Sequence, residues 1–154
     1  MAMRPLSLPA YCIIWLLALP VSARTTVIDD SGTLPNNAAL ALRWDQPSPR
    51  GPNANLMVGT LALRVKLNVS PWLRRSGRIY LVLPAQQPGA ISATWTTQGR
   101  LLPGRLSAGS RALVYAGPIT TPFIEDNVQL TINVDGRRML QMYHVNFRFE
   151  MDEE

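Results

Sequence analysis

Hydrophobic and polar residues alternate along several stretches of the chain, which is the pattern of half-buried β-strands. In "LALRVKLNV" (61–69) every second residue is aliphatic, and "VQLTINV" (128–134) repeats the pattern. "VNFRFEM" alternates in the same way and places Val145, Phe147 and Phe149 on one face. The runs "RIYLVLP", "ISATW" and "RALVYAG" are partly apolar on both faces, as expected for central strands. No stretch carries a sustained helical period.

The dipeptide Asp135-Gly136 predicts a β-hairpin, because glycine readily adopts the positive φ that a type I′ turn requires. In that register Val134 pairs with Arg137 and Ile132 faces Met139, so one apolar face continues through both strands. The final apolar run is longer than its hairpin partner. Its second half should therefore pair with a different strand.

Short strand-like runs separated by turn residues predict an all-β fold. Thirteen prolines and ten glycines interrupt the chain at short intervals. We therefore expect an immunoglobulin-like or pilin-like antiparallel β-sandwich of about seven to nine strands. It should have no disulfide, because Cys12 is the only cysteine.

The N-terminal sequence is typical of a secretory signal peptide. Arg4 supplies the positive charge, Ala10 to Leu19 the apolar segment, and Val21-Ser22-Ala23 a small-x-small cleavage site. This apolar segment is much shorter than the roughly 20 residues needed to span a bilayer, which disfavours an uncleaved anchor. We expect export to the periplasm or cell surface and no integral membrane segment after cleavage.

The predicted organisation is a signal peptide (1–23), a flexible mature N-terminus (24–36), one β-sandwich domain (37–151) and an acidic tail (152–154). A mature chain of this length is sufficient for one hydrophobic core. The segment 46–55, rich in proline and asparagine, should be a loop.

The chain is basic, with a formal net charge of +5, and its cations are unevenly distributed. Ten of them lie between Arg43 and Arg111, where Asp45 is the only acidic residue. All but one of the chain's fifteen cationic residues are arginine, which favours bidentate pairing with carboxylates or phosphates. Genomic base composition is the alternative explanation of this bias. Export argues against nucleic acid as the partner.

The segment "PWLRRSGR" (71–78) joins two predicted strands and has two interpretations. Trp72, Arg74, Arg75 and Arg78 are candidate partner-binding residues for an acidic protein or an anionic glycan, since tryptophan and arginine are enriched at interface hot spots. The alternative, which we favour, is a connecting loop whose tryptophan folds back over the edge of the core.

The chemistry of a typical enzyme is not evident. His144 is the only histidine, and its spacing from Ser70 and Asp126 does not suggest a catalytic triad. One histidine and no cysteine after the leader make a zinc or copper site improbable. Glu125 and Asp126 are neighbours in an expected loop and should point to opposite faces. We expect no enzymatic activity, no metal and no cofactor.

The stretches "GRIYLVLP", "ISATWTTQGRLLPGRLSAGSRALVYAGPI" and "YHVNFRFEMDEE" resemble small exported proteins associated with chaperone–usher fimbrial clusters of enteric bacteria. The resemblance spans residues 56–150. It implies a β-sandwich in a Gram-negative bacterium that acts through protein contacts during pilus assembly or on the cell surface. The implied partner is a pilus subunit, a chaperone or an usher.

Two features separate the chain from a polymerising pilin. Its mature N-terminus offers only Val27, Ile28 and Leu34 as a donor strand, and it lacks a disulfide. An accessory factor or minor subunit of fimbrial assembly or adhesion fits better, with Val145, Phe147 and Phe149 as candidate strand-edge contacts. The alternative is a periplasmic or surface module that binds a glycan or polyanion through the 71–78 loop.

Overall fold

The computed structural model describes residues 24–35, 42–45, 51, 54–85, 91–137 and 146–153. Its elements are β1 (Thr25–Val27), β2 (Leu34–Pro35), β3 (Arg43–Trp44), β4 (Leu56–Asn68), the 3-10 helix η1 (Ser70–Trp72), β5 (Ser76–Leu83), β6 (Ile91–Thr97), β7 (Gly104–Ser107), β8 (Ser110–Pro118), β9 (Phe123–Asp135) and β10 (Arg148–Glu153). The strands β4 to β10 are the longer ones, and β1 to β3 are short additions at sheet edges. No helix in this described part of the chain is long and apolar enough to cross a membrane.

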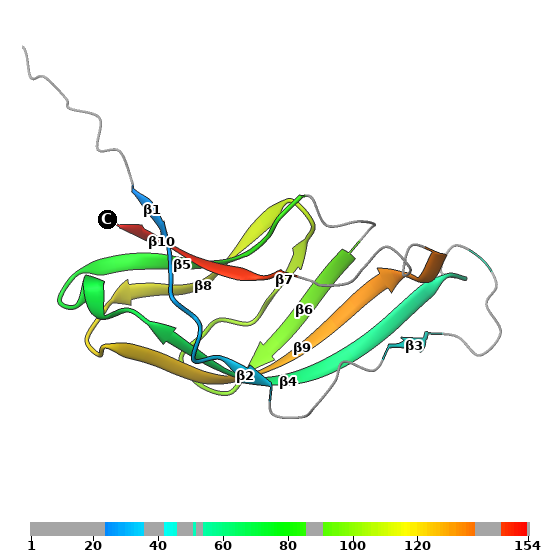
Figure 1. Ribbon diagram of the computed structural model, residues 1–154, viewed down its shortest axis with the longest axis horizontal. Helices are drawn as coiled ribbons and strands as arrows, with labels where there is room; N and C mark the ends of the chain where they lie inside the picture. The colour runs from blue at the N-terminus through cyan, green and yellow to red at the C-terminus, as the bar shows by residue number, and fades with distance from the viewer. Residues whose placement is uncertain are drawn as a thin grey trace, which may run out of the picture.

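The strands form two antiparallel sheets that face each other as a sandwich (Figure 1), which confirms the all-β prediction. The four-stranded sheet has the order β1-β10-β5-β8. The six-stranded sheet has the order β2-β4-β9-β6-β7, and β3 also pairs with β4. As expected for central strands, β5 and β6 each have a neighbour on both sides, whereas β8, which contains the run "RALVYAG", lies at the edge of its sheet.

The alternating runs direct their apolar residues between the sheets, as predicted. Val65 and Leu67 of β4 are buried, and so is every second residue of β9 from Val128 to Val134. Burial of these residues in one continuous cluster is the main stabilising contribution to the fold. Glu150, on the polar face of the run "VNFRFEM", is nevertheless only 9% exposed, and its carboxylate accepts a hydrogen bond from Arg148 Nε at 2.8 Å.

The predicted hairpin at Asp135-Gly136 is wrong. Both edges of β9 are occupied, since Val134 pairs with Met57 of β4 on one side and with Ile91 of β6 on the other. The partner residues expected from 138 to 143 lie outside the described residues, but β9 has no free edge to offer them. Pairing along the full length of β4 and β9 outweighs the local turn preference.

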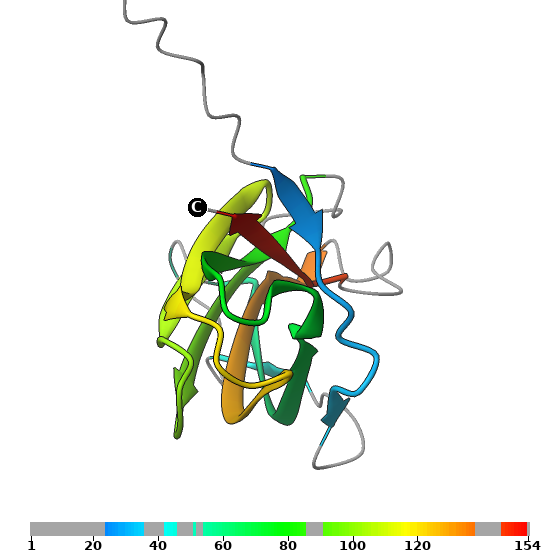
Figure 2. The ribbon, with the colours of Figure 1, turned by 90° about the vertical axis from the view of Figure 1, so that its left-hand side faces the viewer.

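The two ends of the sandwich domain are more ordered than predicted. The segment expected to be flexible forms β1 on the four-stranded sheet and β2 on the six-stranded sheet, and it crosses between the layers along one side (Figure 2). Ile28 inserts into the core at the crossing. Asp152 and Glu153, expected in an acidic tail, belong to β10.

A buried carboxylate organises the connection between β6 and β7. Asp126 lies on β9, not in the expected loop, and is 6% exposed, while Glu125 faces outward as the alternation predicts. Asp126 Oδ1 accepts a hydrogen bond from the backbone N–H of Gln98 (3.2 Å), and Oδ2 accepts one from Leu101 (2.8 Å). A buried group that satisfies two backbone donors is costly to replace.

Asp126→Asn should lower the free energy of unfolding by about 1–3 kcal/mol, because the amide turns one N–H toward a backbone donor. Chemical denaturation measures this change. Glu125→Gln is the matched control, since Glu125 forms an exposed ion pair with Lys66 (3.2 Å) worth less than about 1 kcal/mol. Equal effects of the two substitutions would contradict the role assigned to Asp126.

Candidate functional site at the paired chain ends

The loop around Trp72 is a structural anchor. Trp72 ends the short helix η1, is 7% exposed and packs in the core. Its Nε1 donates a hydrogen bond to Glu153 Oε1 at 2.9 Å. The indole therefore offers little surface to a ligand, in agreement with the interpretation of the segment as a connecting loop.

The three candidate arginines are exposed and have different surroundings. Arg75 Nη1 pairs with Glu153 Oε2 at 3.0 Å. Arg74 occupies a left-handed turn (φ 65°), and its backbone N–H donates to Ile119 O at 2.9 Å. Arg78 lies on β5 opposite Asp152 of β10. The loop thus fastens the end of β10 to the rest of the four-stranded sheet.

The predicted strand-edge residues do not form an open edge. β10 lies between β1 and β5, so neither of its sides is an edge of the sheet. Phe149 of β10 is 7% exposed in the core, and Phe147, just before β10, is partly buried against that core. Val145, like His144, lies outside the described residues.

The chain ends are joined by side chains as well as by strand pairing. Thr25 Oγ1 donates to Asp152 Oδ1 at 2.7 Å, and Arg111 Nη2 lies 3.0 Å from Asp152 Oδ2. The hydrogen bond from Thr25, followed by the contact with Arg111, lowers the pKa of Asp152. Arg111 also stacks on the Tyr80 ring at 4.1 Å. These contacts link β1, β10, β5 and β8 across the outer face of the sheet.

No described residue pairs with the outer edge of β1. Ile28 N–H donates to Phe149 O (2.8 Å), and Arg24 O accepts from Glu153 N–H (3.4 Å). Because backbone groups alternate along an antiparallel strand, those of Thr25 and Val27 point away from β10. The Val27 side chain is 60% exposed. This edge is the candidate functional site.

Two other edge strands, β2 and β8, have features that disfavour pairing. Pro35 in β2 lacks an N–H, and proline is a common protection of edge strands. In β8, the carbonyl of Val114 already accepts a hydrogen bond from Leu102 N–H (2.7 Å), beside an irregularity in the register. β1, with the sequence Thr-Thr-Val, carries no charge, proline or bulge and is protected only by its short length.

No family model, curated protein or solved structure matches the chain. The site therefore has to be interpreted from its own geometry. Among the described residues, histidine, cysteine and acidic side chains form no cluster of three that could hold a metal ion.

An apolar cavity of about 100 Å³ lies in the core beside the crossing segment. Asp30 and Thr33 line it together with Phe147 and Phe149. Burial raises the pKa of Asp30, opposite to the shift of Asp152. No sequence pattern pointed to Asp30, since its burial depends on the course of the chain between the sheets.

The two aspartates should have opposite effects on the pH dependence of stability. The lowered pKa of Asp152 means that its ionised form stabilises the fold above the ordinary value of 3.8, and that this contribution is lost as pH falls through the folded-state pKa. Asp152→Asn should therefore lower the melting temperature at about pH 7 and have little effect near pH 2.

Asp30→Asn should act in the opposite direction. The raised pKa of Asp30 means that stability is lost as pH rises through the folded-state value, so the amide should raise the melting temperature at neutral pH. Scanning calorimetry of both variants between acidic and neutral pH checks the two signs. Parallel pH profiles for the two variants would contradict the assigned environments.

Proposed function

We propose that this is an exported, non-enzymatic β-sandwich protein that acts through protein contacts, as an accessory factor or minor subunit in fimbrial assembly or adhesion. Its partner is a pilus subunit, a chaperone or an usher. The partner adds an extended segment to the outer edge of β1, so that the four-stranded sheet gains a strand.

The open edge of β1 is the observation that carries this proposal. Outward-pointing N–H and C=O groups are a ready template for another strand. Thr25, Thr26 and Val27 have high β-propensity, and no charge on β1 opposes a second chain. Cleavage after Ala23 would leave β1 at the start of the mature chain, where a partner meets no preceding segment.

The acidic side chains at the end of β10 already have hydrogen-bond and ion-pair partners, which supports a binding role over a catalytic one. Asp152 is held by Thr25 and Arg111, and Glu153 is held by Trp72 and Arg75. Groups with these partners hold strands together and are not free for proton transfer. The same contacts disfavour the 71–78 loop as a polyanion site, because the indole is buried and Arg75 is already neutralised.

In-cell photo-crosslinking tests the edge. With a photo-reactive residue at Arg24, Val27→Ala should retain cross-links to a pilus subunit, chaperone or usher. Val27→Pro should reduce them about tenfold, because it removes an outward N–H that the added strand needs while leaving the pairing of Thr26 and Ile28 with β10 intact. Equal cross-linking in both variants, or no protein partner at all, would contradict the proposal.

A cysteine pair separates addition beside β1 from replacement of β1. Val27 and Glu150 are opposite each other at a non-hydrogen-bonded position, where the Cα atoms are close enough for a disulfide. In the Val27→Cys/Glu150→Cys variant, the oxidised and reduced proteins should yield the same cross-links. Loss of cross-links on oxidation alone would show that the partner takes the place of β1.

A further inference from the structure

The outer face of the six-stranded sheet presents an array of uncharged polar side chains across three adjacent strands. Thr131 of β9 lies between Thr60 of β4 and Thr94 of β6. In the next row, Gln129 lies between Ala62 and Thr96. We call these six residues the neutral face: Thr60, Ala62, Thr94, Thr96, Gln129 and Thr131.

Charged residues surround the neutral face but do not enter it. Lys66 and Glu125 pair at one end (3.2 Å), and Asp135 and Arg137 pair at the other (2.6 Å). Arg105 of β7 borders the row of threonines beside Thr94, and Arg64 of β4 lies opposite Asn127, where it pairs with Glu125 at 3.8 Å. The two rows of the neutral face therefore carry no charge themselves, although the chain has a net charge of +5.

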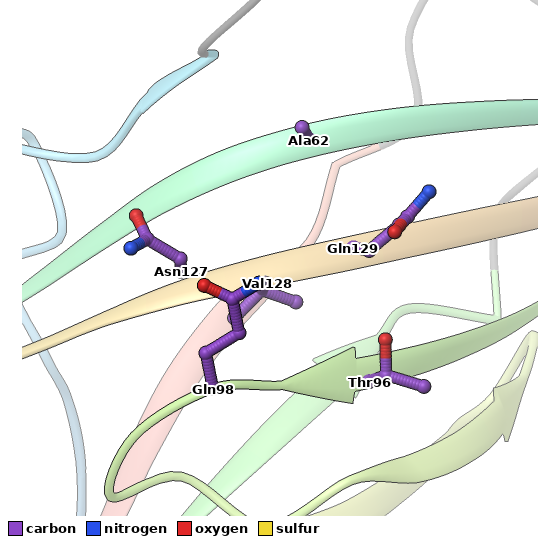
Figure 3. A pocket seen from close by; sticks show the side chains of 6 residues that line it. All are labelled: Ala62, Thr96, Gln98, Asn127, Val128 and Gln129. Atoms are coloured by element: carbon purple, nitrogen blue, oxygen red, sulfur yellow. The ribbon is translucent and has the colours of Figure 1, made fainter.

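The neutral face is hollowed at two adjoining places, of about 260 and 270 Å³. Thr96 and Gln129 line both hollows. Figure 3 shows the first, where Gln98 and Thr96 of the β6 side approach Asn127 and Gln129 of β9. One extended ligand that crosses Thr96 and Gln129 would therefore contact both hollows.

The polar groups of the neutral face are available to a ligand. The side chains of Thr94, Thr96, Gln129 and Thr131 form no hydrogen bond with any other described residue. Their backbone is fixed, because β9 is paired along its length with β4 and β6. The donors and acceptors are thus held in a fixed arrangement without a partner from the described chain.

The chemistry of these groups selects the class of ligand. Hydroxyl and amide side chains both donate and accept hydrogen bonds, which matches ligand hydroxyls. A phosphate, sulfate or carboxylate ligand would instead require arginine or lysine within the hollows. Trp95 contributes to one hollow, but its ring is 4% exposed and its Nε1 donates to Leu102 O (2.9 Å). Stacking is therefore not available, and recognition depends on hydrogen bonds alone.

We propose that the neutral face binds an uncharged, hydroxyl-rich oligosaccharide that lies across both hollows. Because each hydrogen bond contributes little and no aromatic ring stacks on the sugar, affinity depends on the number of sugar units in contact. A hexasaccharide should bind more tightly than a disaccharide of the same sugar. Binding should be insensitive to salt, since no ion pair forms.

NMR titration of the mature protein tests this site. The probes are neutral gluco-, galacto- and manno-configured hexasaccharides, their disaccharides, and a sulfated hexasaccharide. We expect at least one neutral hexasaccharide to shift the amides of residues 94–98 and 127–131, with the same dissociation constant in low salt and in about 0.5 M NaCl. The double substitution Thr96→Ala/Gln129→Ala should weaken binding about tenfold.

Thr60→Ala is the matched control, because Thr60 lies on the neutral face but lines neither hollow, and it should change affinity less than about twofold. Val27→Pro should leave glycan binding unchanged. The two proposals, strand addition at β1 and glycan binding at the neutral face, can therefore be refuted independently of each other. No shift with any neutral hexasaccharide would overturn the proposal. Binding of the sulfated probe alone would also overturn it. So would shifts of these amides that depend on protein concentration in the absence of sugar, because they would indicate that a second copy of the chain binds the neutral face.

Discussion

Insertion of the C-terminal strand between β1 and β5 is the interaction on which the fold and the candidate site both depend. β10 pairs with β5 from Arg148 to Glu153 and with β1 on its other side. Its inward residues, Phe149 and Met151, fill the core of the four-stranded side. Because β10 is enclosed, the edge of the four-stranded sheet lies at β1, which is the strand on which the proposed function rests.

The same insertion accounts for part of the uneven charge of the sequence. The basic middle of the chain and its acidic end are complementary in space: Arg75 pairs with Glu153, and Arg111 pairs with Asp152. The arginine bias thus serves partly to hold β10. A polyanion that approaches the 71–78 loop would compete with these internal carboxylates, whereas the edge of β1 and the neutral face involve no such competition.

Local patterns predicted the strands and the buried faces, because alternation with period two depends on neighbouring residues. They failed where distant residues decide the outcome. The hairpin predicted at Asp135-Gly136 is wrong because β9 pairs with β4 and β6 instead. The order of β1 depends on its pairing with β10, where Thr25 contacts Asp152, 127 positions away. The site at β1 could not be found from sequence, since its strand is too short to alternate.

Residue-resolved amide hydrogen exchange of the free protein shows whether β1 is paired on one side only. A β1 that is paired on one side only should protect the amide of Ile28, which donates to Phe149 O, and leave the amide of Val27 to exchange at nearly its intrinsic rate. Equal protection of Val27 and Ile28 would show that the outer edge of β1 is already covered. Rapid exchange of both would show that β1 is not held by β10, and either result would contradict the account.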